Sequence, residues 1–273
     1  MKKGFTITEL IVAISLLAAV IAASGIVFHY SIDAQRIALA TTEIMRTLRS
    51  ITDQLDADFA GIRDGSEAPL IIEFHKGAAL NDPNADSIVF FTVGGFQDSD
   101  GAVRGNVARI YYGQADAMGN CPDPLSSNEK DRRNKILARK QVILAPAEPN
   151  DSNENEYEPN SLIQQVIDYR PPSRYVSVSN GWLLRPVIDP NNASGIPMYL
   201  AKGVDDFSIM FCESNDIVGG AINWQSRPDG ARRYCGISLR PYPELIKFTF
   251  TLYDSKGILK GGRRFEHIVY IGR

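Results

Sequence analysis

The chain opens with residues 1–28, MKKGFTITELIVAISLLAAVIAASGIVF, and this stretch decides the fold. Lys2 and Lys3 precede a run from Leu10 to Phe28 that carries no charged side chain. As a helix this run would span about 28 Å, close to the hydrocarbon thickness of a bilayer. The positive-inside rule keeps the lysines on the cytoplasmic side, so the sequence predicts one membrane span with the remainder of the chain exported.

Glu9 is the unusual residue at the start of this run. An acidic side chain in a membrane helix is costly, on a scale of about 2.5–3.5 kcal/mol at a central position. An ordinary secretory signal has a basic start, an apolar stretch and a small-residue cleavage site, and gains nothing from an acid there. One interpretation is that Glu9 lies at the interface and reaches water. The other gives its carboxylate a specific role.

The segment Lys2–Leu10 resembles the class III signal of type IV pilins and type II secretion pseudopilins. In that family a membrane aspartyl peptidase cleaves after the glycine, here Gly4, and N-methylates the new first residue, here Phe5. The family's glutamate at the fifth mature position corresponds to Glu9. The resemblance implies that Glu9 of one subunit neutralises the Phe5 amine of its neighbour, because a buried amine and a buried carboxylate each need a partner.

The helical pattern continues beyond the membrane segment. No proline occurs before Pro69, and apolar residues recur at gaps of three, four or seven, which is one stripe of an α-helix. The stripe consists of Ile37, Ile44, Leu48, Ile51, Leu55, Phe59 and Ile62. Charged residues, Asp58 among them, lie off this stripe. We predict one helix over residues 5–63, membrane-spanning over 5–30 and amphipathic over 31–63.

The rest of the chain, residues 64–273, shows short strand patterns separated by turn residues. The predicted strands are Leu70–Phe74, Ser87–Val93, Ala108–Tyr112, Tyr175–Val178, Trp182–Val187, Met198–Leu200 and Phe207–Cys212. A C-terminal hairpin joins Lys247–Tyr253 to Phe265–Ile271, whose second strand is apolar enough to be covered on both faces. A polar stretch over about 116–172 indicates an inserted loop region. We expect an α+β fold, with the long helix packed on an antiparallel β-rich domain.

The chain has three cysteines, Cys121, Cys212 and Cys235. If the β-rich domain is exported, it lies in an oxidising space where disulfides persist. Cys212 and Cys235 enclose a glycine-rich, tryptophan-containing stretch and are the expected pair, which leaves Cys121 over. Three free thiols remain the alternative, because sequence alone does not give the pairing.

The later segments narrow the resemblance to a subtype. Their order is similar to that of J-type minor pseudopilins of type II secretion, with W-type minor pilins of type IV pili close behind. The segments are Ile44–Arg49, Gln54–Phe59, Ile88–Gly95, Arg109–Tyr112, Leu183–Arg185, Gly203–Ile209 and Pro243–Phe250. The resemblance implies a pilin-like fold with a leader over residues 1–4. It also implies a structural role near the tip of a pseudopilus, where the subunit helps to initiate assembly and drive export across the outer membrane.

The J-type resemblance further implies a location and partners. The chain would sit in the bacterial inner membrane with a cytoplasmic N-terminus and a periplasmic domain, and then enter the pseudopilus. Its partners would be the prepilin peptidase, inner-membrane lipid and other minor and major pseudopilins, expected to be of the I and K types. A net charge of −3 gives no basis for a nucleic-acid partner.

The sequence carries no signature of catalysis. His29, His75 and His267 lie far apart and have no metal-ligand spacing, and the nucleophile-elbow, P-loop and dinucleotide motifs are missing. We therefore predict no enzyme activity, no cofactor and no metal. Two other functions remain open. One is a minor pilin of a type IV pilus, acting in adhesion, motility or DNA uptake. The other is an exported enzyme or binding protein whose ordinary signal is cut near Val20–Ala22.

Overall fold

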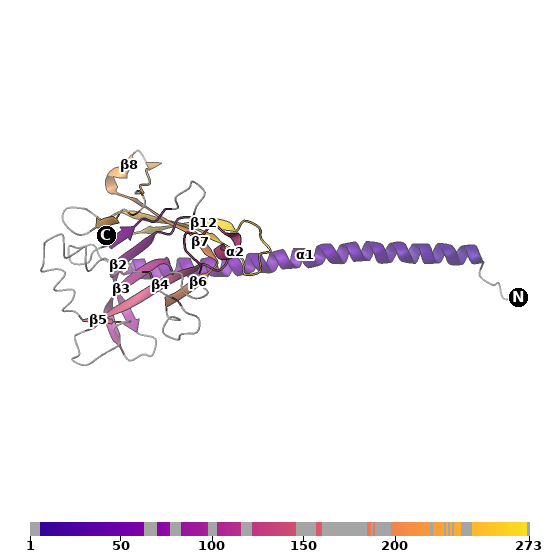
Figure 1. The fold of residues 1–273 in the computed structure, drawn as a ribbon, viewed down its shortest axis with the longest axis horizontal. Coiled ribbons are helices and arrows are strands. Elements are labelled where there is room, and N and C mark those ends of the chain that lie inside the picture. Colours follow the sequence, from indigo (N-terminus) through magenta and orange to yellow (C-terminus); the bar gives the residue numbers. More distant parts are fainter. Residues whose placement is uncertain are drawn as a thin grey trace.

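The structure is a computed structural model of the chain. It describes residues 6–62, 70–76, 83–97, 103–115, 122–145, 157–159, 185–186, 188, 198–218, 221–226, 228, 230, 232–235 and 242–271. One long helix is followed by antiparallel sheets that pack against its second half, and the first half projects from the β domain (Figure 1). The expected α+β class is confirmed.

Helix α1 spans Ile7–Ala60, 54 residues, and extends about 81 Å at 1.5 Å per residue. Thr6 caps its start and Gly61 its end. A Cβ atom on Gly61 would collide with the carbonyl oxygen of Val93, so glycine allows the chain to leave the helix close to a neighbouring strand. The predicted single helix is confirmed, and it ends three residues before the predicted position.

The two halves of α1 differ in exposure. Side chains up to Leu39 are almost all exposed, whereas burial against the β domain begins at Ala40. The buried residues of α1 are Ala40, Ile44, Ile51, Leu55, Asp58 and Phe59. The predicted stripe is therefore confirmed from Ile44 onward, with Leu48 packed at its margin. Ile37 is 47% exposed, so the contact with the β domain begins later along the helix than predicted.

The larger sheet has seven strands. They are β1 (Leu70–Glu73), β2 (Ser87–Gln97), β3 (Arg104–Gln114), β4 (Ile136–Ala145), β5 (Tyr157–Pro159), β6 (Tyr199–Lys202) and β10 (Arg232–Cys235). Their order is β10-β1-β2-β3-β4-β5, and β6 also pairs with β4. The β4–β5 pair is parallel and the other pairs are antiparallel.

A second sheet has three strands, β7 (Val204–Cys212), β11 (Leu245–Leu252) and β12 (Arg263–Tyr270), in the order β12-β11-β7. Two short strands, β8 (Ile217–Val218) and β9 (Ala221–Ile222), form a separate hairpin. A short helix, α2 (Glu129–Arg132), precedes β4, and a 3-10 turn, η2 (Ser214–Asp216), follows β7.

The core lies where α1 meets both sheets. The ring of Phe59 is 4.2 Å from that of Phe90 in β2 and 5.7 Å from that of Phe248 in β11, between ring centroids. Phe248 lies 5.9 Å from Phe207 in β7. All four side chains are buried. One helix residue thus contacts both sheets, and aromatic burial of this kind is a large apolar contribution to holding the helix in place.

Strand β12 is not covered on both faces as predicted. It pairs with β11 and is the last strand of its sheet in the described part of the chain. Phe265, His267 and Val269 are half-buried or buried, whereas Ile268 is 41% and Tyr270 74% exposed. A sheet that meets a helix on one face leaves its other face to solvent. Side chains along β12 therefore alternate between covered and exposed, although the strand is apolar in composition.

Part of the predicted insertion over about 116–172 belongs to the larger sheet. It contains α2 and β4, and β4 pairs with β3 over most of its length. Leu137 and Ile143 of β4 are completely buried. The prediction of a loop is therefore wrong for β4, whose apolar character is interrupted by Arg139, Lys140 and Gln141.

The other strand predictions divide into two groups. Those within residues 70–74, 87–93, 108–112, 198–200 and 207–212, and the C-terminal hairpin, are confirmed. The strand predicted at Tyr175–Val178, and most of that at Trp182–Val187, lie outside the described residues.

Candidate functional site

The first candidate site is the bare half of α1. Its large apolar side chains from Ile7 to Leu39 are between 47% and 79% exposed, far more apolar surface than a soluble monomer normally presents. Among the described helices, α1 alone is long and apolar enough to cross a membrane. Such a segment fits a membrane anchor or a signal sequence.

The two serines of the apolar run form hydrogen bonds within the helix. Ser15 Oγ donates to the carbonyl oxygen of Ile11, and Ser24 Oγ to that of Val20, both at 2.8 Å. Asp33 then lies beside His29 and Arg36, at 3.1 and 3.9 Å. A lipid-facing helix needs its polar groups paired within itself, and the first charged residues after the apolar run pair with one another.

Glu9 lies in the first turn of α1 and is held by Thr6. The Thr6 backbone N–H donates to Glu9 Oε2 at 2.9 Å, and the Thr6 hydroxyl lies 3.0 Å from the same oxygen. The Glu9 N–H donates to Thr6 Oγ1 at 3.3 Å, which completes a capping box. Oε1 of Glu9 accepts no hydrogen bond from the described residues of the helix. Oε2 of Glu9 thus orders the start of the helix.

The remaining residues of the predicted signal, Gly4 and Phe5, lie outside the described residues. Cleavage after Gly4, methylation of Phe5 and the pairing of Glu9 with a neighbouring amine therefore stay predictions. The Thr6–Glu9 cap is compatible with cleavage, because both residues would remain in the processed chain and Thr6 would keep its amide N–H.

The second candidate feature is a buried polar network that joins α1 to the larger sheet. Asp58 accepts two hydrogen bonds from the guanidinium of Arg139 in β4, at 2.6 and 2.7 Å, and one from the hydroxyl of Tyr112 in β3. Gln54 donates to Oδ1 of Asp58 at 3.1 Å, and Thr92 Oγ1 donates to its backbone carbonyl at 2.6 Å. The carboxylate is 3% exposed, so this network fixes the helix on the sheet.

Burial, followed by the negative charge of Asp58, raises the pKa of Tyr112 well above its ordinary value. Tyr112 therefore stays protonated and acts as a hydrogen-bond donor. The apolar stripe predicted from the sequence excludes Asp58 and gives no indication of this network. A local signal was present, because Asp58 follows Leu55 by three residues and precedes Ile62 by four, which is the spacing of the buried face.

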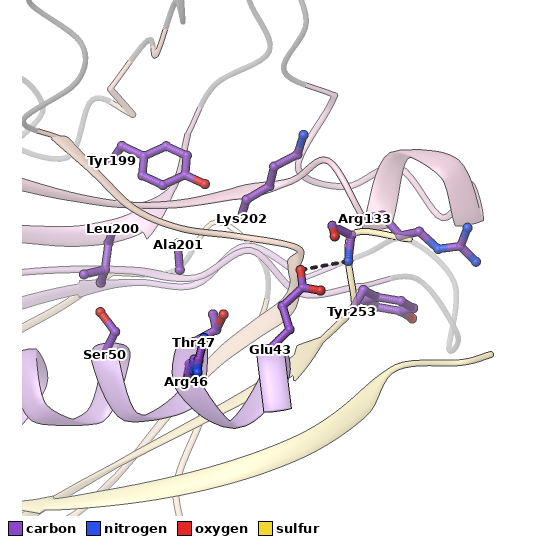
Figure 2. A pocket seen from close by; sticks show the side chains of 11 residues that line it. Glu43, Arg46, Thr47, Ser50, Arg133, Tyr199, Leu200, Ala201, Lys202 and Tyr253 are labelled. Atoms are coloured by element: carbon purple, nitrogen blue, oxygen red, sulfur yellow. Dashed lines mark hydrogen bonds between the residues drawn. The ribbon is translucent and has the colours of Figure 1, made fainter. Parts of the chain in front are cut away.

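A groove of about 430 Å³ opens where α1 leaves the β domain (Figure 2). Glu43 of α1 accepts a hydrogen bond from the backbone N–H of Ser255 at 3.1 Å, which ties the loop between β11 and β12 to the helix. Arg133 and Lys202 line the opposite side of the groove. The groove is an open surface feature with a mixed polar and charged lining.

A buried ion pair supports the same region. Lys135 Nζ lies 2.5 Å from Asp205 Oδ1, and both side chains are at most 3% exposed. Burial lowers the pKa of Lys135, and the charge of Asp205 opposes that shift. Arg132 reaches the other carboxylate oxygen at 3.4 Å. These contacts hold the segment around α2 against β7, so the buried charges of Lys135 and Asp205 have a structural role.

Within the described residues, no group of three or more His, Cys, Asp or Glu side chains could hold a metal ion. His29 contacts Asp33, and His267 contacts Asp56 at 2.8 Å. His29 thus lies on α1 and His267 on β12, each with a carboxylate partner from α1 and not in a shared cluster.

The predicted disulfide between Cys212 and Cys235 stays a prediction. Cys212 ends β7 as a buried free thiol that donates to the carbonyl oxygen of Glu213 at 3.4 Å. Burial, together with the nearby carboxylates of Asp216 and Glu244, raises the pKa of this thiol. The backbone of Cys235 lies in β10, but its side chain is outside the description, as is Cys121. Alkylation of the denatured, unreduced protein would decide between a Cys212–Cys235 disulfide and free thiols.

Comparison with protein-family models, curated proteins and solved structures finds no match to this chain. The class of protein is therefore inferred from the architecture alone. A long apolar N-terminal helix followed by an antiparallel β domain, with the helix half bare and half packed on the sheets, is a pilin-like architecture.

Proposed function

We propose that this chain is a minor pseudopilin of the J type, a structural subunit near the tip of a type II secretion pseudopilus. It would help to initiate the filament and so drive export of proteins across the outer membrane. The bare apolar half of α1 carries the proposal, since a surface of this length needs lipid or the helices of other subunits around it. The J subtype rests on the sequence segments that resemble that group.

The attachment of the helix to its domain supports a mechanical role. A subunit that is pushed through its helix must transmit force to its globular domain without the two separating. Asp58, Arg139 and Phe59 tie the helix to both sheets through a buried ion pair and an aromatic cluster. We therefore propose that the chain acts as a load-bearing subunit and has no catalytic activity or cofactor.

The proposal also assigns a location and partners. The helix would anchor the chain in the bacterial inner membrane with its N-terminus in the cytoplasm, and the β domain would lie in the periplasm. The prepilin peptidase would cleave between Gly4 and Phe5. Other pseudopilins, expected to be of the I and K types, would then surround the apolar helix in the filament, where Phe5 and Glu9 would set the register between subunits.

Mass spectrometry of the mature N-terminus from a membrane fraction tests the proposal. The expected result is a chain that begins at N-methylated Phe5. A chain that begins near Ala23, or that retains Met1, would overturn the assignment to this class. Crosslinking followed by identification of the partners then tests the subtype, since capture of type IV pilus subunits instead of secretion pseudopilins would make the chain a minor pilin.

A further inference from the structure

The loop between β11 and β12 carries a concentrated positive charge. We call residues 255–264, which comprise this loop and the first two residues of β12, the basic rim loop. Its exposed charged side chains are Lys256, Lys260, Arg263 and Arg264, and all four are cations. The loop lies beside α1 at the end of the β domain from which the bare half of the helix projects (Figure 1).

The acidic residue immediately before this loop, Asp254, makes its hydrogen bonds within the loop. Asp254 is 1% exposed, and its carboxylate accepts hydrogen bonds from the N–H groups of Ile258 and Leu259 at 2.7 and 2.9 Å. Leu259 packs against the core. The backbone of the loop is therefore ordered by Asp254, and the positive charge that faces solvent is not neutralised within the loop.

The loop is fixed to the helix at a defined height above the apolar run. Ser255 is bonded to Glu43, and Arg263 Nη2 lies 3.4 Å from Thr41 Oγ1. Lys256 lines a cavity of about 390 Å³ together with Arg36 and Glu43 of α1. Along the helix axis, Arg36 lies about 12 Å and Thr41 about 20 Å beyond Phe28, and the headgroup layer of a bilayer occupies about 5–8 Å of these distances. The remaining gap of about 4–15 Å is comparable with the Debye length, about 8 Å at physiological ionic strength.

We propose that the basic rim loop docks on anionic phospholipid headgroups of the leaflet from which α1 emerges. The proposal rests on the membrane-anchored state assigned above. A bilayer surface fits better than an acidic protein partner, because the cations gather on the rim that the helix holds toward the membrane. Lysine and arginine side chains close to an anionic membrane surface are attracted to it. The contact would hold the β domain upright over its anchor before the subunit enters a filament.

Lysine acetylation in lipid nanodiscs tests the inference with the unmodified full-length chain. The protein is inserted into discs of phosphatidylcholine alone and into discs that also contain phosphatidylglycerol, and the acetylation rate of each lysine is measured by mass spectrometry. We expect Lys256 and Lys260 to react about fivefold more slowly in the anionic discs. Lys247, near the opposite end of β11, is the internal control and should react equally in both. Protection should disappear at 1 M salt, where the Debye length is about 3 Å.

Two variants provide a matched comparison. Neutralising the rim with K256Q, K260Q, R263Q and R264Q should abolish lipid-dependent protection of the helix-facing residue Ser255 in hydrogen exchange. Neutralising Arg104, which is also exposed but lies at the start of β3 and pairs with Gln97 of β2, should leave it unchanged. Equal acetylation of Lys256 in both discs, or protection that arises only when other pseudopilins are added, would overturn the inference. Failure of the chain to enter discs at all would instead overturn the membrane-anchored state.

Discussion

Arg139 in β4 donates two hydrogen bonds to Asp58 in α1, from Nε to Oδ2 at 2.6 Å and from Nη2 to Oδ1 at 2.7 Å. Both side chains are largely enclosed, with 16% and 3% of their surface exposed. A bidentate pair restricts direction as well as distance, so it fixes the rotation of the helix about its axis in addition to its position. The apolar contacts of Phe59 alone would allow more freedom.

Replacing Asp58 by alanine should strongly destabilise the β domain. The substitution leaves the buried guanidinium of Arg139 without its partner, and removal of one member of a buried ion pair costs about 3–5 kcal/mol. Urea unfolding of the full-length protein in detergent, followed by tryptophan fluorescence, would measure the change. Asp56→Asn is the matched control. It removes a carboxylate that is 59% exposed and contacts His267, and exposed pairs contribute about 0–1 kcal/mol. Equal losses in the two variants would contradict the structural role of Asp58.

The buried carboxyl group of Asp86 should make the stability of the protein depend on pH. Its Oδ1 accepts the N–H of His75 and its Oδ2 accepts that of Ile209 in β7, both at 2.8 Å, so it links the two sheets. Burial raises the pKa of Asp86 to about 6, although the backbone N–H groups oppose the shift. The folded state therefore binds a proton more tightly than the unfolded state. Its contribution to the free energy of unfolding is fully present below about pH 4. As the pH rises to about 6 and above, this contribution is lost, and the free energy of unfolding falls by about 3 kcal/mol.

The measurement is the difference between wild type and Asp86→Asn in urea unfolding from pH 4.5 to 7.5. The asparagine cannot ionise, so the variant should lack the component of stability that falls with rising pH, whatever its absolute stability. Asp56→Asn, which removes an exposed carboxylate, should retain it. A wild-type slope that persists in Asp86→Asn would show that another group is responsible.

The elements that could be predicted from the sequence are those specified by local periodicity. The stripe from Ile44 to Phe59 repeats at the helical spacing, and the alternation of Phe248 and Phe250 specifies a strand. The elements that were missed depend on distant partners. Asp58 can be buried because it pairs with Arg139, which lies 81 residues further along the chain. Without knowledge of that partner, a charged residue on a helix indicates a solvated face.

The same reasoning explains the errors in the sheets. Strand β4 contains polar residues in its middle, which diluted its apolar signal, and Arg139 among them points to a carboxylate on another element. The apolar residues Ile268 and Tyr270 of β12 suggested burial on both faces, but the strand is the last in its sheet and leaves them exposed. Whether a strand face is covered depends on the neighbours that the fold supplies.

Gly203 should tolerate alanine poorly because of both its backbone and its surroundings. Its φ is +76°, and a Cβ atom would lie 2.6 Å from the carbonyl oxygen of Tyr253. Gly261 has a φ of +86° but open space around its Cβ position, so it is the matched control. We expect about 1–2 kcal/mol for Gly261→Ala from the backbone alone and a clearly larger loss for Gly203→Ala. Equal losses in thermal unfolding would mean that the turn before β7 relaxes around the methyl group.

Glu9 offers a test that separates helix capping from subunit recognition. Within one chain its Oε2 accepts from Thr6, and a glutamine at this position would keep an acceptor oxygen for that contact while losing the charge. Loss of the cap itself costs only about 1 kcal/mol. If Glu9 acts through its charge on the Phe5 amine of a neighbouring subunit, Glu9→Gln should fail in co-assembly as completely as Glu9→Val, since neither neutralises a buried cation.

Both variants should still be cleaved after Gly4, which N-terminal mass analysis of the membrane fraction would show, and co-assembly would be measured by crosslinking to the other subunits. The conservative change Glu9→Asp is informative as well, because it retains the charge on a shorter side chain and should recover part of the assembly. A Glu9→Gln protein that assembles normally would reduce Glu9 to a helix cap. In that case Phe5 would need another partner, and the register between neighbouring subunits would have to come from apolar packing of the bare half of α1.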